Sequence, residues 1–155
     1  MKFFKFSFYI LVVAVLFNSC KKEYSSEQLL APIGSWEFRE GSMYSGYLDN
    51  FHKSTGIGSN AQVLSGKTFD NTQSFELKII TDSLKTGTFR ASQSQCSFLF
   101  SSGGKTIYAA NELIGEFIIT ITSIGTTSIT GTFSGTAVDK SSNLVQITEG
   151  KFNIQ

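Results

Sequence analysis

Apolar and polar residues alternate with a period of two over most of the chain from Ser35 onward. Clear examples are the segments 75–80 (FELKII), 117–122 (FIITIT) and 128–134 (SITGTFS). A half-buried β-strand produces this pattern, because successive side chains point to opposite faces of a sheet. This part of the sequence has no long apolar stripe at the 3.6-residue spacing of an amphipathic helix. The alternation therefore predicts an all-β domain.

Residues that favour turns separate the alternating segments. They are Asp49-Asn50, Ser65-Gly66-Lys67, Asp70-Asn71, Asp82-Ser83, Ser101–Gly104, Gly125-Thr126, Ser141–Asn143 and Glu149-Gly150. The runs between them predict strands near 35–40, 43–49, 61–65, 73–80, 86–91, 94–100, 106–109, 114–123, 127–137 and 144–154. Such spacing is typical of an antiparallel β-sandwich or a small barrel, here of roughly eight to ten short strands. We expect the last strand to bend at Gly150.

The first 19 residues differ in character from the rest of the chain. Lys2 and Lys5 precede an apolar run over 6–17 that only Ser7 interrupts. This run is too short for a membrane-spanning helix, which needs roughly 20 apolar residues, and it has the length of the apolar part of a signal peptide. Residues 1–19 are therefore predicted to form a signal-peptide helix that is removed after export.

The residues that follow this run resemble a bacterial lipobox. In Phe17-Asn18-Ser19-Cys20, a small residue precedes a cysteine, and Phe17 stands where leucine is usual. The resemblance implies cleavage between Ser19 and Cys20 and acylation of Cys20 with lipids such as palmitate. Three acyl chains exceed the two signals that stable membrane anchoring requires. Cys20 is therefore the predicted link to a membrane.

Residues 20–34 are expected to be a lipidated N-terminus and a flexible tether, followed by a single domain over 35–155. Removing 1–19 takes away two of the 13 basic residues and none of the 12 acidic ones, which leaves a net charge of −1. This balance argues against a nucleic-acid partner, which needs clustered positive charge. No aspartate follows Cys20, and the charged segment 21–23 resembles the surface-export signals of Bacteroidetes lipoproteins. The outer membrane, on its periplasmic or its surface side, is the expected location.

Both ends of the predicted domain resemble one group of proteins. The segments 119–123 (ITITS), 131–136 (GTFSGT) and 145–152 (VQITEGKF), together with 34–41 (GSWEFREG), are similar to uncharacterised Bacteroidetes lipoproteins with a β-sandwich-like domain. The resemblance implies a fold and an envelope location, and it implies no activity. Separately, Gly34-Ser35-Trp36 resembles the first strand of lipocalins, which would imply a barrel that carries a small apolar ligand.

The sequence offers no clear catalytic, metal or cofactor site. The chain has one histidine, His52, and two cysteines, Cys20 and Cys96, whereas metal sites need clustered ligands. Cys96 shares one strand face with Phe98 and Phe100, so it is predicted to be a small buried hydrophobe. The alternative is a nucleophile with His52 as its base. We expect a protein without enzymatic activity, metal or cofactor.

Two weaker signals concern the surface. Segment 43–51 (MYSGYLDNF) is both aromatic and polar, and Tyr44 and Tyr47 are candidates for an aromatic binding surface because exposed rings stack on sugars or pack against proteins. The alternative is that they are ordinary strand residues with half of the rings inside. Asp82-Ser83-Leu84 resembles the acceptor of Bacteroidetes O-glycosylation, which makes Ser83 a candidate for modification.

These observations favour a lipid-anchored envelope lipoprotein whose domain binds a glycan or a protein without catalysis, or has a structural role. Two alternatives stay open. A lipocalin-like carrier needs an apolar cavity of a few hundred Å³. An envelope hydrolase needs two carboxylates that face each other across a cleft, and the 12 acidic residues are scattered singly along the chain.

We predict that Cys20→Ala abolishes lipidation and releases the protein from the membrane fraction, because the acylated residue is lost. Metabolic labelling with palmitate and membrane sedimentation measure both effects. Cys96→Ala is the matched control and should keep the label. An acylated, membrane-bound Cys20→Ala protein would contradict the predicted anchor.

Overall fold

The computed structural model describes residues 33–56 and 59–155. It contains the strands β1 (Gly34–Glu40), β2 (Ser42–Gly56), β3 (Ser59–Thr68), β4 (Gln73–Ile80), β5 (Gly87–Arg90), β6 (Cys96–Ser102), β7 (Lys105–Ala110), β8 (Phe117–Ile124), β9 (Ile129–Asp139) and β10 (Leu144–Ile154), with a 3₁₀ turn, η1 (Ala91–Gln93), after β5. The predicted all-β fold is confirmed. The predicted signal peptide, the lipidation residue Cys20 and the tether up to residue 32 lie outside the described residues.

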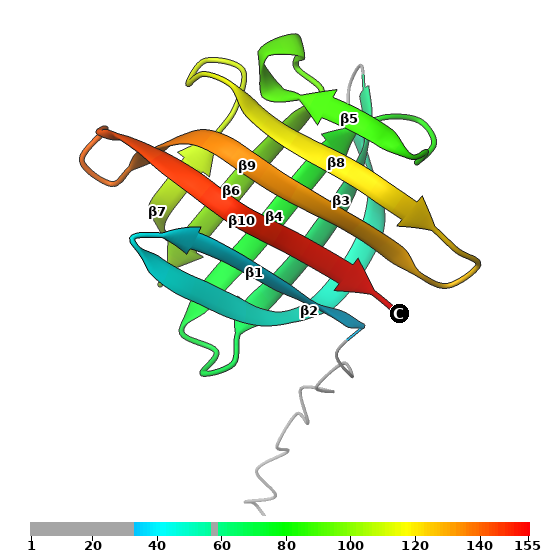
Figure 1. The fold of residues 1–155 in the computed structure, drawn as a ribbon, viewed down its shortest axis with the longest axis horizontal. Helices are drawn as coiled ribbons and strands as arrows, with labels where there is room; N and C mark the ends of the chain where they lie inside the picture. The colour runs from blue at the N-terminus through cyan, green and yellow to red at the C-terminus, as the bar shows by residue number, and fades with distance from the viewer. Residues whose placement is uncertain (1–32, 57–58) are drawn as a thin grey trace, which may run out of the picture.

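The strands form an antiparallel barrel (Figure 1). Eight of them, β1, β2, β3, β4, β6, β7, β9 and β10, follow one another around the barrel in chain order, and the pairing of β10 with β1 closes it. The closure on the other side is short, since β7 meets β9 only at Tyr108–Asp139 and Ala109–Val138. Strands β8 and β5 continue the sheet from β9. In Figure 1, β8, β9, β10 and β1 cross in front of β3, β4 and β6.

Aromatic rings fill the interior between these two groups of strands. The buried aromatic side chains are Trp36, Phe38, Phe75, Phe89, Phe98, Phe100, Tyr108, Phe117, Phe133 and Phe152. Trp36 stacks on Phe75 with ring centroids 4.5 Å apart. Phe38 lies among several rings. Its ring centroid is 5.0 Å from that of Tyr44 and 6.4 Å from that of Tyr108. Because each ring buries a large apolar area and packs edge-to-face or offset on its neighbours, this cluster is the main source of stability.

Two glycines allow aromatic side chains to pack this closely. A Cβ atom on Gly46 would lie 2.7 Å from Cζ2 of Trp36, and a Cβ atom on Gly131 would lie 2.3 Å from Cζ of Phe152. Gly46 is the cross-strand partner of Trp36, and Gly131 is that of Phe152. The missing side chains therefore make room for the two rings directly opposite them.

Three of the predicted turns are wrong. Asp49-Asn50 lies inside β2, which continues to Gly56, and Ser65-Gly66-Lys67 lies inside β3. Around Asp49 the pairing with β3 shifts register between Leu48 and Asn50. A β-bulge of this kind increases the local twist of a strand. The polar residues at this position, which would favour a turn, instead allow β2 to bend. The bend follows the part of β2 that pairs with β1 (42–48) and precedes the part that pairs only with β3 (50–56).

The third wrong turn, Glu149-Gly150, is a second bulge. The pairing of β10 with β9 shifts register between Ile147 and Gly150, and Glu149 has a φ of 55°. Ile147 and Phe152 are both buried, although their odd separation would place them on opposite faces of a regular strand. The bulge restores both side chains to the interior. The bend that the sequence predicts at Gly150 is thus present, within a continuous strand.

We predict that Phe38→Ala lowers the free energy of unfolding by about 3–5 kcal/mol, the usual loss for a fully buried phenylalanine. Phe69→Ala, the same substitution at a side chain that is 71% exposed, should cost less than about 1 kcal/mol. Urea denaturation followed by tryptophan fluorescence measures both. Equal losses in the two variants would contradict the central position of Phe38.

Candidate binding groove on the outer face

A groove of about 570 Å³ runs over the outer face of the sheet, across β8, β9, β10, β1 and β2. Its lining residues are Ser35, Trp36, Glu37, Ser45, Gly46, Phe69, Thr122, Thr130, Gly131, Thr132, Lys151, Phe152 and Asn153. Trp36 and Phe152 are buried residues that belong to the floor. Phe69 comes from the turn between β3 and β4. The polar side chains of the lining come from outward strand positions, where the alternation requires polar residues.

Cross-strand pairing aligns the polar side chains of the groove. Ser35 lies opposite Asn153, and Asn153 lies opposite Thr130. Directly paired residues share one face of a sheet, with Cβ atoms about 5 Å apart. Ser, Thr and Asn side chains both donate and accept hydrogen bonds. The outward face of β9, β10 and β1 therefore presents a row of neutral groups of both kinds.

One ion pair lies within the groove. Lys151 Nζ is 3.2 Å from Glu37 Oε1, and the two residues are cross-strand partners. Ser45 stands opposite Glu37 on β2, and Thr132 stands opposite Lys151 on β9. The side chain of Glu37 is 42% exposed and that of Lys151 is 65% exposed, so the pair adds little to stability. Its effect on the groove is to balance the charge and to offer a carboxylate and an ammonium side by side.

An aromatic rim borders the groove next to β2. Phe69 lies in the turn between β3 and β4 and is 71% exposed. Its ring centroid is 6.4 Å from that of Tyr47, with the planes inclined by 45°. The hydroxyl of Tyr47 donates a hydrogen bond to Oδ1 of Asn71 in the same turn. Two rings on the outer face are thus held next to each other.

The turn that carries Phe69 is fixed by Asp70. Its Oδ1 accepts hydrogen bonds from Thr68 Oγ1 at 2.5 Å, from the Thr72 amide at 3.1 Å and from Thr72 Oγ1 at 2.9 Å. These bonds lower the pKa of Asp70, that from Thr68 most. Asn71 adopts a φ of 60°, a conformation that asparagine tolerates better than most residues. A network of local bonds therefore holds the exposed ring of Phe69 beside the groove.

Tyr44 and Tyr47, the predicted aromatic surface, lie on opposite faces of β2. Tyr47 is on the outer face beside the groove. Tyr44 instead packs against the core, with its ring 5.0 Å from Phe38, and its hydroxyl is 3.3 Å from that of Tyr108. The Tyr108 hydroxyl donates to Glu40 Oε2 at 2.7 Å. Tyr44 and Tyr47 therefore do not form one surface, and the aromatic neighbour of Tyr47 is Phe69, which the sequence did not single out.

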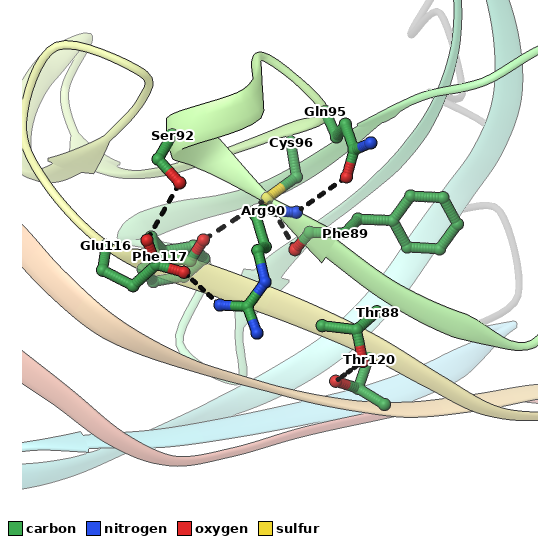
Figure 2. Close-up of polar contacts among 9 residues, drawn as sticks. All are labelled: Thr88, Phe89, Arg90, Ser92, Gln95, Cys96, Glu116, Phe117 and Thr120. Carbon is green, nitrogen blue, oxygen red and sulfur yellow. Dashed lines mark hydrogen bonds and ion pairs between the residues drawn. The ribbon is translucent and has the colours of Figure 1, made fainter.

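Cys96 lies in the core, away from solvent (Figure 2). Its thiol donates to the carbonyl of Phe89 at 3.3 Å and lies 3.8 Å from that of Phe117. Burial raises the pKa of Cys96 to about 11, because the thiolate loses hydration there. Figure 2 also shows that Arg90 and Ser92 both bond to Glu116 close to the thiol. The burial of Cys96 and the contacts of its thiol with two backbone carbonyls fit a small residue packed in the core.

The two other sequence candidates lie away from the groove. His52 is exposed on β2. Ser83, the candidate for O-glycosylation, lies in the exposed turn between β4 and β5, where its carbonyl accepts a hydrogen bond from Thr81 Oγ1 at 2.9 Å. An exposed turn is accessible to a modifying enzyme, and the glycosylation of Ser83 stays a prediction.

Comparison with protein-family models, with curated proteins and with solved structures finds no match to this chain. The resemblance to Bacteroidetes lipoproteins therefore stays an expectation. Within residues 33–56 and 59–155, no three histidine, cysteine or acidic side chains are grouped in a way that could hold a metal ion. In the same part of the chain, no helix is long and apolar enough to cross a membrane.

We predict that native Cys96 resists alkylation by iodoacetamide at pH 8, because a buried thiol with a pKa of about 11 is protonated at that pH and only the thiolate reacts. The same thiol should react rapidly in urea, once unfolding returns its pKa to the ordinary value. The Cys20→Ala variant leaves Cys96 as the only thiol, so mass spectrometry can follow it alone. Rapid native modification would instead favour a reactive cysteine.

Proposed function

We propose that this protein is a lipid-anchored module of the bacterial cell envelope that binds a glycan, without catalysis, in the groove across β8, β9, β10, β1 and β2. The observation that carries the proposal is the combination of a polar groove with an exposed aromatic rim. Sugars present hydroxyl groups around a ring whose faces are partly apolar, so their binding needs both kinds of partner.

The polar part of the groove matches the hydroxyl groups of a sugar. Ser35, Thr130 and Asn153 offer donors and acceptors in a row, as sugar hydroxyls do. The pair of Glu37 and Lys151 adds one strong acceptor and one strong donor 3.2 Å apart, a spacing that suits two neighbouring hydroxyls of one ring. Hydrogen bonds to charged groups are stronger than those between neutral groups.

The aromatic part supplies the apolar contact. Phe69 is 71% exposed although it is a large apolar residue, and Asp70 holds its turn in place. A ring that is already fixed loses little entropy when it binds a ligand. A protein partner fits this groove less well, because the centre of a protein interface is depleted of charged residues, whereas Glu37 and Lys151 lie within the groove.

The first described residues of the chain enter the barrel next to the groove, which Ser35 lines. Ile33 hydrogen-bonds to Leu48 and to Gln155, the C-terminal residue, so the chain joins the barrel two residues before Ser35. The segment from Cys20 to Ile33 spans at most about 45 Å when fully extended. A lipid on Cys20 would therefore keep the groove close to the membrane, where envelope glycans are abundant.

A carrier of a small apolar ligand is the second candidate, and the closed barrel is the observation that favours it. Such a carrier holds its ligand in an apolar interior cavity of at least about 300 Å³. Here the ring of Phe38 occupies the interior. The ring centroids of Phe98, Phe100 and Phe133 lie 5.1–6.1 Å from its own. The packing therefore supports a ligand on the outside.

We predict that the protein is retarded in affinity gels that contain xyloglucan, glucomannan or hydroxyethyl cellulose, and that Phe69→Ala weakens this binding about tenfold or more, since burial of a phenylalanine is worth about 1.5–3 kcal/mol. Leu144→Ala is the matched control. Leu144 is 69% exposed and lies at the start of β10, far along the strand from Asn153.

Three results would contradict this proposal. The protein could fail to bind every polysaccharide, it could bind them equally well with and without the Phe69 ring, or it could instead bind a protein through the groove. Saturable binding of a fatty acid or an apolar dye in the interior would favour the carrier.

A further inference from the structure

A second, smaller groove of about 220 Å³ lies on another side of the barrel. Its lining residues are Asp49, Ser65, Gly66, Lys67, Ser74, Phe75, Glu76, Leu99 and Ser101. They come from β2, β3, β4 and β6. The groove across β8, β9, β10, β1 and β2, here called the first groove, is lined mostly by β9, β10 and β1. In Figure 1 these three strands cross in front of β3, β4 and β6.

A pair of stacked rings lies between the two grooves. Trp36 belongs to the floor of the first groove and Phe75 to the floor of the second. Both side chains point into the barrel, where they are buried and stack with their ring centroids 4.5 Å apart and their planes inclined by 5°. The residues before and after each ring point the other way, out of the barrel. The outward side chains beside Trp36 and those beside Phe75 therefore face opposite sides of the molecule.

The floors of the two grooves are built in the same way. In the first groove, Trp36 is the cross-strand partner of Gly46, and in the second, Phe75 is the cross-strand partner of Gly66. In each pair the aromatic ring points into the core and the glycine has no side chain. The floor is therefore a stretch of backbone, and the side chains on either side of it point outward and form the walls.

Polar side chains form the walls of the second groove. Ser65 and Glu76 are cross-strand partners on one side of the floor, and Lys67 and Ser74 are partners on the other. Ser101, the partner of Ser74, extends the second wall onto β6. Hydroxyl groups both donate and accept hydrogen bonds, a carboxylate accepts them and an ammonium donates them. The second groove thus offers the same kinds of polar group as the first.

Leu99 gives the second groove an exposed apolar contact. It is the cross-strand partner of Glu76 on β6, and it is 36% exposed. In the first groove this part is played by Phe69, which is larger and 71% exposed. The apolar contribution to binding grows with the area that is buried. We therefore expect the second groove to bind the same class of ligand more weakly than the first.

We infer that the protein binds two glycan chains at once, one in each groove, and so connects them. This inference rests on the proposed glycan binding and adds a second site to it. Because the grooves face opposite sides of a solid core, a single extended chain cannot occupy both. In a network of chains, the second contact keeps the protein in place when the first one opens, so two weak sites together hold more firmly than either alone.

The test asks whether a captured protein retains a second chain. The full chain, in phosphatidylcholine nanodiscs that hold one copy each, is captured on beads that carry xyloglucan, glucomannan or hydroxyethyl cellulose. A fluorescent polysaccharide of the same kind is then added, and the beads are washed. We expect the captured protein to retain more label than beads without protein do. Capture without retention of the label would overturn the inference and leave the proposed function in place.

A variant pair assigns the second contact to the second groove. Ser74→Gln places a larger side chain there and should lower the retained label at least about tenfold, because a protein with one site cannot connect two chains. Its capture on the beads should change little. Ser97→Gln is the control, since Ser97 is an outward residue of β6 that lies outside the groove. Equal retention by the two variants would overturn the role of the second groove.

Calorimetry adds a measurement that needs no change in the second groove. Titration with short oligosaccharides of the bound polysaccharide should give two ligands for each wild-type protein, and one for each Phe69→Ala protein. A single ligand for each wild-type protein would overturn the inference but not the proposed function. The absence of binding to every polysaccharide would overturn both.

Discussion

The packing of aromatic rings inside the barrel constrains everything else about this molecule. Trp36 stacks on Phe75, and Phe38 lies against rings from both groups of strands. Interiors packed in this way leave few voids larger than a water molecule. The barrel is therefore a solid support, and the proposed glycan would contact side chains on its outer surface.

The same packing orders the outer face. Strand alternation means that each buried ring fixes the outward direction of its neighbours, so Trp36 and Phe38 set the positions of Ser35 and Glu37. Two bulges, at Leu48–Asn50 and at Ile147–Gly150, keep the interior filled where the strands bend. The polar groove is thus a consequence of a register that the core specifies, because a slip of one residue would turn every ring outward.

Most of the strands could be predicted from the sequence, because a half-buried strand shows its period directly, as in 75–80. The bulge at Ile147–Gly150 could also have been found, since Ile147 and Phe152 are separated by an odd number of residues and can both face the interior only if the strand has one. The odd separation of Tyr44 and Tyr47 likewise places them on opposite faces. The groove could not be predicted, because Ser35 and Asn153 meet only through closure of the barrel, and alternation carries no information on which distant strands pair. Phe69 could not be predicted as a rim residue because it stands outside every alternating segment.

The central claim is that the ligand lies on the outer face and not inside the barrel. An NMR titration of the isotope-labelled protein with xyloglucan oligosaccharides, glucomannan oligosaccharides and cellohexaose tests it most directly. We expect the amide shifts of Ser35, Tyr47 and Asn153 to change while those of the buried residues Phe98 and Ile79 stay constant. Shift changes confined to the interior residues, or no changes with any of these sugars, would contradict the account.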